Sequence, residues 1–356
     1  MKSQKNLDEQ NLNFANMIES SNKIIFTNIR NKKLSFAQKA FAIDSPLLKT
    51  LWRMFKIIFE FLIIGLIVIS ITFFLINAVP GSNSIVASAK TPEAREAIEA
   101  KYGLNLPLMQ RYFNYIQGIF RGDFGISLSL FPGQEINSFI WIRFYKSFLV
   151  GIFSVFLTVV IGISLGIWVG KNPGGIVDNV STVLVSIFSS VPSIIFALVL
   201  IFIGRAVGIP YVFEMNDFST FILPGIALSL GSIIVYIKYI RTELNRELNS
   251  VHAKFAYLKG LTKNRFVWKH ALKPALFPIA TFFPAVIFGS FIGSIFIEQI
   301  FFIPGSGATL LQAIQTKDYN VILFLIIIFA LLTIVSYATR DILYEAIDPR
   351  VRRRGK

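Results

Sequence analysis

The chain has 356 residues, of which 54% are hydrophobic and only 15% are charged. Soluble domains carry about 25% charged residues and are about half apolar, so this composition excludes an ordinary soluble domain and predicts an integral membrane protein. The net charge of +15 fits basic loops on the cytoplasmic side, and we expect no nucleic-acid partner. With no cysteine, disulfides, thiolate metal sites and cysteine nucleophiles are excluded.

Residues 1–48 form a polar segment rich in Asn, Ser, Lys and Gln. Its apolar periodicity is weak, which predicts a cytoplasmic extension that is disordered or loosely helical. A cleavable signal peptide would place a short apolar core near the start of the chain, and this segment has none. We therefore expect the first apolar segment to remain as a membrane anchor.

Six apolar segments follow, each long enough to cross a hydrocarbon core of about 30 Å at about 1.5 Å per residue. We predict an all-α integral membrane protein with six transmembrane helices. Internal Gly and Pro permit kinks and close helix contact; ordinary packing accounts for most of them, but Pro192 and Pro284 are candidate hinges. The segments run over approximately Ile57–Val79, Ser147–Gly170, Val180–Gly204, Phe218–Tyr239, Phe277–Glu298 and Asn320–Leu343.

The distribution of Lys and Arg predicts the orientation, because these residues concentrate in cytoplasmic loops. With the N-terminus inside, 26 of the 35 Lys and Arg fall in the cytoplasmic parts. The long loop 80–146 lies outside the safe range of this rule, but the short loops agree without it. Both termini are therefore predicted to be cytoplasmic. The cytoplasmic parts would be 1–56, 171–179, 238–276 and 340–356.

The external loop 80–146 is predicted to contain two short helices. Residues 93–102 have a helical composition, with Thr91 as a plausible N-cap and Pro92 at the first helical position. Residues 107–118 have the pattern of a second, amphipathic helix. Two helices on the outer surface could cap the bundle or dock an external partner, and the sequence favours neither alternative.

No stretch matches the phosphate-binding pattern G-x-x-x-x-G-K-[ST]. Lys259-Gly260 and Pro304–Gly307 lack the lysine and hydroxyl that such a loop needs, so the chain is not expected to hydrolyse ATP itself. Few ionisable residues lie inside the apolar segments, which argues against a proton-driven pump. No catalytic set is visible that would indicate an intramembrane enzyme. A self-sufficient secondary transporter or channel built from the six-span bundle remains an alternative.

Glu298 lies at the outer end of the fifth apolar segment, next to the glycine-rich stretch Phe301–Gly307. Glu298, Pro304 and Gly305 are candidate residues of an external gate. The alternative is that Glu298 only marks the membrane boundary, and the two interpretations are evenly matched.

The segment 241–276, between the fourth and fifth apolar segments, is the most informative part of the chain. Asn245–Lys259 is predicted to form a helix, which Gly260 ends as a left-handed residue. Thr262 can cap a second short helix, although Arg265 stands where a capping box would have Glu or Gln. Two helices that meet at a glycine form a rigid elbow, and such a loop suits a socket on a soluble partner.

A series of short motifs runs along the chain, each weak alone but strong in this order and spacing. They are Ala78–Gly81, Tyr102–Pro107, Gly122–Ser127, Ser190–Ser193, Leu223-Pro224, Lys259–Leu261, Lys273–Pro278, Glu298 with Pro304-Gly305, Lys317–Tyr319 and Asp348–Arg350. Over roughly residues 49–352, the chain resembles the permease subunits of binding-protein-dependent ABC importers of the oligopeptide/dipeptide type. Within that group it is most similar to the first of the two oligopeptide permease subunits.

The resemblance implies the type I ABC importer permease fold. It implies a first transmembrane helix at 49–79, an extracytoplasmic helical loop at 80–146, and a permease core at 147–356 that contains five transmembrane helices and the coupling loop 241–276. The extension 1–48 has no counterpart in the family, and no role is assigned to it.

The resemblance also implies a multi-pass protein of the cell membrane and a set of partners. A second homologous permease subunit would complete the pore, two ABC ATPase subunits would use ATP and Mg, and an extracytoplasmic peptide-binding protein would deliver peptide. This chain would be no enzyme and would bind no cofactor or metal. Oligopeptides are the expected cargo, and dipeptides or nickel chelates are alternatives.

By the same resemblance, residues 253–262 would contact the ATPase, with Ala256 packing and Gly260 setting the bend. The family motif begins Glu-Ala-Ala six residues before its glycine, whereas this chain has Lys254-Phe255-Ala256 there. A basic first residue is usual in the oligopeptide branch, but Phe255, Val251 and His252 depart from the pattern and indicate an altered partner surface. The predicted contact residues are Ala253, Lys254, Phe255, Ala256, Lys259, Gly260, Leu261 and Thr262.

Overall fold

A computed structural model describes residues 46–78, 91–101, 103 and 105–347. Most of the predicted extension 1–48, most of the motif Ala78–Gly81 and all of Asp348–Arg350 lie outside these ranges. The chain divides into two compact units, Met1–Leu62 and Ile63–Lys356. In the first unit, the described residues form the beginning of helix α2 (Pro46–Ala78), and the rings of Phe55 and Phe59 stack along it at 6.1 Å.

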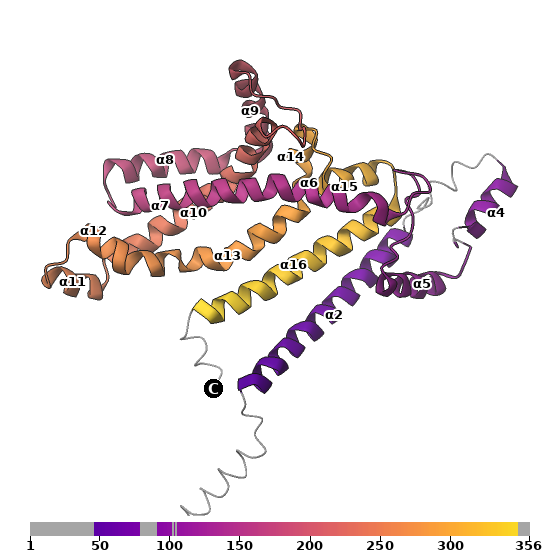
Figure 1. The fold of residues 1–356 in the computed structure, drawn as a ribbon, viewed down its shortest axis with the longest axis horizontal. Coiled ribbons are helices and arrows are strands. Elements are labelled where there is room, and N and C mark those ends of the chain that lie inside the picture. The colour runs from indigo at the N-terminus through magenta and orange to yellow at the C-terminus, as the bar shows by residue number, and fades with distance from the viewer. Residues whose placement is uncertain (1–45, 79–90, 102, 104, 348–356) are drawn as a thin grey trace, which may run out of the picture. The chain divides into compact units, whose positions relative to one another are not determined.

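The described part of the second unit is helical (Figure 1), apart from loops and one isolated β-bridge between Ile126 and Glu135. Two of its elements are π-helical turns, η1 and η2, which interrupt longer helices. The elements are α4 (Pro92–Lys101), α5 (Leu108–Arg121), α6 (Ile136–Leu157), η1 (Thr158–Gly162), α7 (Ile163–Gly170), α8 (Ile176–Ser190), α9 (Ser193–Val207), α10 (Ser219–Leu248), α11 (Val251–Leu258), α12 (Lys263–Phe266), η2 (Val267–Ala271), α13 (Leu272–Ile292), α14 (Ile295–Ile300), α15 (Ser306–Gln315) and α16 (Tyr319–Ile347).

Within the described ranges, five helical stretches are long and apolar enough to cross a membrane. The paired helices α8 and α9 make a sixth candidate if they are counted as one span. The chain is therefore an all-α membrane protein with five or six candidate spans. The five are Phe59–Ala78, Ile136–Gly170, Ser219–Leu248, Lys263–Ile300 and Tyr319–Leu343.

The predicted third span, Val180–Gly204, is not one continuous helix. It is broken between α8 and α9, which are bent by 103° relative to each other. Pro192 explains the break: a proline disfavours helical backbone at the residue before it and has no N–H to donate. Val191 accordingly has extended backbone, and Pro192 becomes the N-cap residue of α9.

Two of the largest differences from the predictions concern helix boundaries. The helix expected to begin at Ser147 begins at Ile136, and α10 continues past Tyr239 to Leu248. The length of an apolar run underestimates the length of a helix that extends beyond the membrane. Only one face of such an extension is buried, so only that face is apolar. In α10, for example, Leu244 and Leu248 are buried in the extension.

Both helices predicted in the loop after α2 are present as α4 and α5. α5 runs to Arg121 rather than Gly118, and Gly122 ends it with φ of +74°. The amide of Asp123 donates to the carbonyl of Gly118 at 2.9 Å, the closing bond of a glycine-terminated helix. α5 also packs against α2. The ring of Tyr112 on α5 lies 5.5 Å from the ring of Phe73 on α2.

α10 lies at the centre of the second unit, where it packs against α6, α7, α9 and α13 (Figure 1). Three glycines spaced by four residues on η1 and α7 face three large side chains on α10. A Cβ on any of them would come within about 3 Å of those side chains, so only glycine permits this approach, as in other small-residue contacts between membrane helices. The facing pairs are Gly162 with Tyr236, Gly166 with Ile240 and Gly170 with Leu244.

Asp318 joins two of the short motifs across the fold. This fully buried carboxylate accepts a hydrogen bond from Ser127 Oγ at 2.5 Å. The same oxygen accepts from the backbone amides of Ser129 at 3.0 Å and Leu130 at 2.9 Å. The loop before α6 is thereby fixed to the beginning of α16.

Replacing Asp318 with Ala should lower the free energy of unfolding by about 3 kcal/mol, since it removes the shared acceptor of one buried and two partly buried donors. A denaturant titration of the purified protein in detergent measures this. The control is Asp123→Ala in the same loop: Asp123 is exposed and accepts one bond, from Gly125 N at 2.9 Å, so its loss should cost less than about 1 kcal/mol. Equal losses would contradict the role of Asp318.

Candidate functional site

The elbow predicted between the fourth and fifth apolar segments consists of α11, the turn 259–262 and α12. The predicted single helix Asn245–Lys259 is wrong, because α10 ends at Leu248 and α11 begins at Val251. Ser250 separates them: its Oγ accepts the amide of Ala253 at 3.2 Å as the N-cap of α11. Serine is among the preferred N-cap residues, so Ser250 was the signal that could have placed this break.

Gly260 adopts φ of +82°, the left-handed conformation that the sequence predicts at the end of α11. Its amide donates to the Tyr257 carbonyl at 2.9 Å, and the amide of Leu261 donates to the Ala256 carbonyl at 3.1 Å. This pair of bonds is the Schellman motif. A Cβ at Gly260 would meet nothing within 4 Å, so the need for glycine comes from the backbone angle and not from crowding.

The helix after the turn does not stay short. Thr262 accepts the amide of Arg265 at 3.4 Å and begins α12. α12 then continues through η2 into α13, so the prediction of a separate short helix is wrong. Because the helical stretch has no loop between Lys263 and Ile292, α12 is the terminal part of the candidate membrane-spanning helix that begins at Lys263.

One face of α11 holds the elbow against the bundle. Ala253 is fully buried in a cluster with Phe266 and Leu248, and Ala256 and Tyr257 pack against that cluster. The rings of Tyr257 and Phe266 lie 5.4 Å apart. The predicted contact residues Ala253 and Ala256 therefore face the bundle and position the helix.

The opposite face of α11 is apolar and exposed. Val251, Phe255 and Leu258 follow one another at helical spacing and are 68%, 61% and 83% exposed, so they form one outward stripe. Lys254, Lys259 and Thr262 are exposed beside it and Leu261 is half-buried. The unusual residues Val251 and Phe255 thus lie at the surface.

His252, the third unusual residue, has a different place. Its Nε2 lies 3.0 Å from Oε2 of Glu247, and its ring lies 5.5 Å from the ring of Phe266. Glu247 is largely buried at the end of α10. His252 therefore contacts the α10–α11 junction, which sequence spacing alone did not indicate.

A second turn, between α7 and α8, supports the elbow. Lys263 Nζ donates to Asn172 Oδ1 at 3.0 Å, and Lys171 Nζ lies 4.9 Å from the centre of the Trp268 ring. These contacts join the beginning of α12 and η2 to the residues just before α8.

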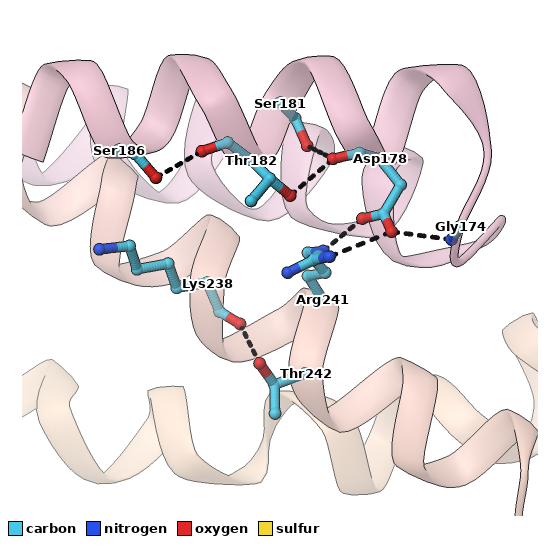
Figure 2. A network of polar contacts seen from close by, with 8 residues as sticks. All are labelled: Gly174, Asp178, Ser181, Thr182, Ser186, Lys238, Arg241 and Thr242. Atoms are coloured by element: carbon cyan, nitrogen blue, oxygen red, sulfur yellow. Dashed lines mark hydrogen bonds and ion pairs between the residues drawn. The ribbon is translucent and has the colours of Figure 1, made fainter.

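The Asp178–Arg241 ion pair connects α8 to α10 (Figure 2). The guanidinium binds both carboxylate oxygens, through Nε to Oδ1 and through Nη2 to Oδ2 at 3.1 Å. The amide of Gly174 also donates to Oδ2 at 2.8 Å. Asp178 is 3% exposed, whereas Arg241 is 36% exposed. Sequence analysis did not predict this pair, whose members are 63 positions apart.

The predicted gate residues lie together at the far end of α13 from the elbow (Figure 1). Glu298 is buried, and its carboxylate accepts Ser147 Oγ and the amide of Ala308, both at 2.7 Å. Ser147 Oγ in turn accepts the amide of Ser306 at 2.7 Å. Gly305 is buried beside this network and Pro304 is half-buried. The network fixes the turn between α14 and α15 to α6.

The two predicted hinge residues lie in different settings. Pro192 lies at the bend between α8 and α9. Pro284 lies inside α13, where it is buried. Both positions stay candidates for hinges.

Comparison with known proteins identifies the family. Residues 162–353 match the model of the binding-protein-dependent transport system inner membrane component, and residues 47–129 match the N-terminal model for membrane components of the same systems. The chain belongs to this family. It is the permease of an ABC importer of the oligopeptide/dipeptide type, a multi-pass protein of the inner membrane and a non-catalytic subunit.

Several curated relatives of this permease align over most of its length. The oligopeptide transport system permease protein OppB of Haemophilus influenzae is 34% identical over 84% of this chain and 100% of its own length. The dipeptide transport system permease protein DppB of Lactococcus lactis is 33% identical over 80% of this chain and 94% of its own. The oligopeptide transport system permease protein AppB of Bacillus subtilis is 30% identical over 82% and 95%. These matches confirm the resemblance inferred from the motifs.

Removing Arg241 should destabilise the permease more than removing the charge of Asp178. Arg241→Met leaves a buried carboxylate without a cation, which costs about 3 kcal/mol. Asp178→Asn leaves the half-exposed Arg241 free to reach water and should cost about 1 kcal/mol. Denaturant titration of both variants in detergent gives the comparison, and a larger loss for Asp178→Asn would contradict it.

Proposed function

We propose that this permease is one of two pore-forming subunits of an ATP-driven importer that takes up oligopeptides. The observation that carries the proposal is the elbow: an exposed apolar stripe on a short helix, fixed by a glycine turn to the end of a membrane-spanning helix. The relatives named for oligopeptide transport support oligopeptides as cargo, and one named for dipeptide transport makes dipeptides the nearest alternative.

In this proposal both termini and the elbow are cytoplasmic. The excess of Lys and Arg in the parts 1–56, 171–179, 238–276 and 340–356 supports that orientation. The network around Glu298, at the far end of α13, would then lie at the external side. Glu298, Pro304 and Gly305 stay the predicted external gate, with the hydrogen bonds of Glu298 as the contacts that an opening movement would break.

The proposed partners supply functions for which this chain has no suitable residues. No stretch of the sequence provides a phosphate-binding loop, so two ABC ATPase subunits would supply the energy from ATP and Mg. A second, homologous permease would complete the pore. An extracytoplasmic binding protein would deliver the peptide, as the description of the family indicates.

The elbow would dock in a groove of the ATPase through Val251, Phe255 and Leu258. Apolar side chains at the centre of a contact with charged residues at its rim are typical of protein interfaces, and Lys254 and Lys259 would form such a rim here. Val251 and Phe255, which depart from the family pattern, lie on this proposed docking surface. A matching departure is therefore expected in the groove of the ATPase.

Movement of the elbow would reach the bundle along three connections. α12 passes it directly to α13, because the helical stretch is unbroken. Ala253 and Phe266 pass it to α10 through their shared cluster with Leu248. The Lys263–Asn172 contact passes it to the turn before α8. A rigid elbow transmits such a displacement, whereas a flexible loop would absorb it.

Transport by a purified complex tests the function. The permease, its partner permease, the ATPases and the binding protein are reconstituted in vesicles, and uptake of labelled dialanine, tetraalanine and a nickel–histidine chelate is measured with and without ATP. We expect ATP-dependent uptake of tetraalanine. Uptake by this chain alone without ATP would establish a self-sufficient carrier, and uptake of only dialanine or the chelate would reassign the cargo.

Gly260→Val should leave membrane insertion intact but uncouple transport from ATP hydrolysis. A β-branched residue resists positive φ, and a left-handed backbone costs an ordinary residue about 1–2 kcal/mol, so the turn would lose its fixed angle. ATP hydrolysis and tetraalanine uptake by the same vesicles measure the coupling.

Asn264→Val is the matched control for this substitution. Asn264 lies in the same elbow, is exposed, and occupies a helical position in α12, where valine is compatible with the backbone. Its uptake per ATP hydrolysed should stay near that of the unmodified complex. Normal peptide uptake by the Gly260→Val complex would refute the role of the turn.

A further inference from the structure

A cavity of about 290 Å³ lies among α6, α10 and α13. Its walls are made largely of small residues, among them Gly151, Gly289 and Ala285. Ala285 is exposed and Gly289 is half-buried, so the cavity is open beside α13. The hydroxyl side chains that line it are Ser147, Ser154, Ser232 and Ser290.

Two of these hydroxyls already have partners. Ser147 donates to Glu298 at 2.7 Å, and Ser290 donates to the carbonyl of Ile287. Ser154 and Ser232 make no side-chain hydrogen bond with any part of the chain that the structure describes. Ser154 is only 8% exposed as a residue, and it lines the cavity together with Ser232. Both groups are therefore available to a molecule inside the cavity.

The hydroxyls of Ser154 and Ser232 lie near the middle of the membrane, as judged from their positions in the candidate spans. Ser154 lies near the middle of the candidate span Ile136–Gly170, and Ser232 lies near the middle of Ser219–Leu248. Polar side chains at membrane depth usually face the bundle interior or a water-filled cavity and mark the route of a substrate. A larger groove of about 570 Å³ between α7, α8 and α10 lacks this property, because its serines, Ser181 and Ser229, donate to backbone carbonyls.

We infer that this cavity contacts the backbone of the peptide during translocation, with Ser154 and Ser232 as its hydrogen-bonding groups; the inference rests on the proposed function. A hydroxyl both donates and accepts, so each serine can bind either an N–H or a C=O of an extended chain. Contacts to the backbone, between walls of small residues, accept peptides of different side chains.

The size and charge of the cavity agree with this occupant. Pockets for whole drug-sized ligands begin at about 300 Å³, so the cavity holds only a short part of a peptide at a time. The one carboxylate in its wall, Glu298, already accepts bonds from Ser147 and Ala308. The free groups are therefore neutral, which favours recognition of the peptide backbone over charged side chains.

The absence of cysteine from the whole chain allows a direct test. Ser232→Cys places the only thiol of this subunit in the cavity, and its modification by a water-soluble thiosulfonate is followed in the reconstituted complex with binding protein and ATP. We expect modification without peptide. Tetraalanine at about ten times its Kd should slow modification roughly tenfold, because protection follows 1 + [L]/Kd.

Ser229→Cys is the matched control: it lies on the same helix, three residues away, and lines the other groove. Its modification should not depend on the peptide. If Ser232→Cys is unreactive, or reacts equally fast with and without tetraalanine in a complex that imports tetraalanine, the inference is wrong while the proposed function stands. If the unmodified complex does not import the peptide, both fail.

A second measurement tests the inference if the Ser232→Cys subunit does not assemble into the complex. The double variant Ser154→Ala and Ser232→Ala should raise the tetraalanine concentration for half-maximal uptake about tenfold, as the loss of two modest hydrogen bonds predicts. Ser229→Ala should leave the half-maximal concentration unchanged, and an unchanged value in the double variant would also overturn the inference.

Discussion

In a lipid bilayer, helices gain no hydrophobic stabilisation from leaving the solvent, so their association depends on close packing and hydrogen bonds. The contact that satisfies this constraint here is the approach of η1 and α7 to α10, made possible by Gly162, Gly166 and Gly170. With α10 fixed in this way, its other faces become positions for function. It holds Ser232 in the cavity and Arg241 against α8, and its far end packs under the elbow through Leu248.

Buried carboxylates fix the ends of several helices. Asp178 accepts the Gly174 amide, Glu298 accepts the Ala308 amide, and Asp318 accepts the amides of Ser129 and Leu130. Each carboxyl group accepts hydrogen bonds from backbone donors in a turn or at a helix beginning, where they have no intrahelical partner. The permease thus uses its few buried acids to hold turns in place, and the transmembrane middle is left to small and neutral groups such as Ser154.

The apolar segments and the turn residues could be predicted from the sequence because they depend on local properties. Run length predicted the candidate spans, and Gly260 predicted the end of α11 from its conformational freedom. The bend at Pro192 and the break at Ser250 also have local causes, but the apolar and helical patterns around them concealed both. The Asp178–Arg241 pair and the Ser127–Asp318 bond join residues 63 and 191 positions apart, and no spacing rule relates such positions.

The π-helical turn η1 (Thr158–Gly162) affects how the length of this helix can change. A π-turn closes its bonds over one more residue than an α-turn, so it contains one residue in excess of a regular helix. Deleting a single residue there would restore an ordinary helix and leave α7 close to its present orientation, because the π-turn takes up the extra residue locally. Gly166 and Gly170 would still face Ile240 and Leu244, whereas a deletion within the regular helix α7 would turn the residues beyond it by about 100°. The π-turn therefore allows this helix to change its length by one residue without losing its glycine contacts with α10.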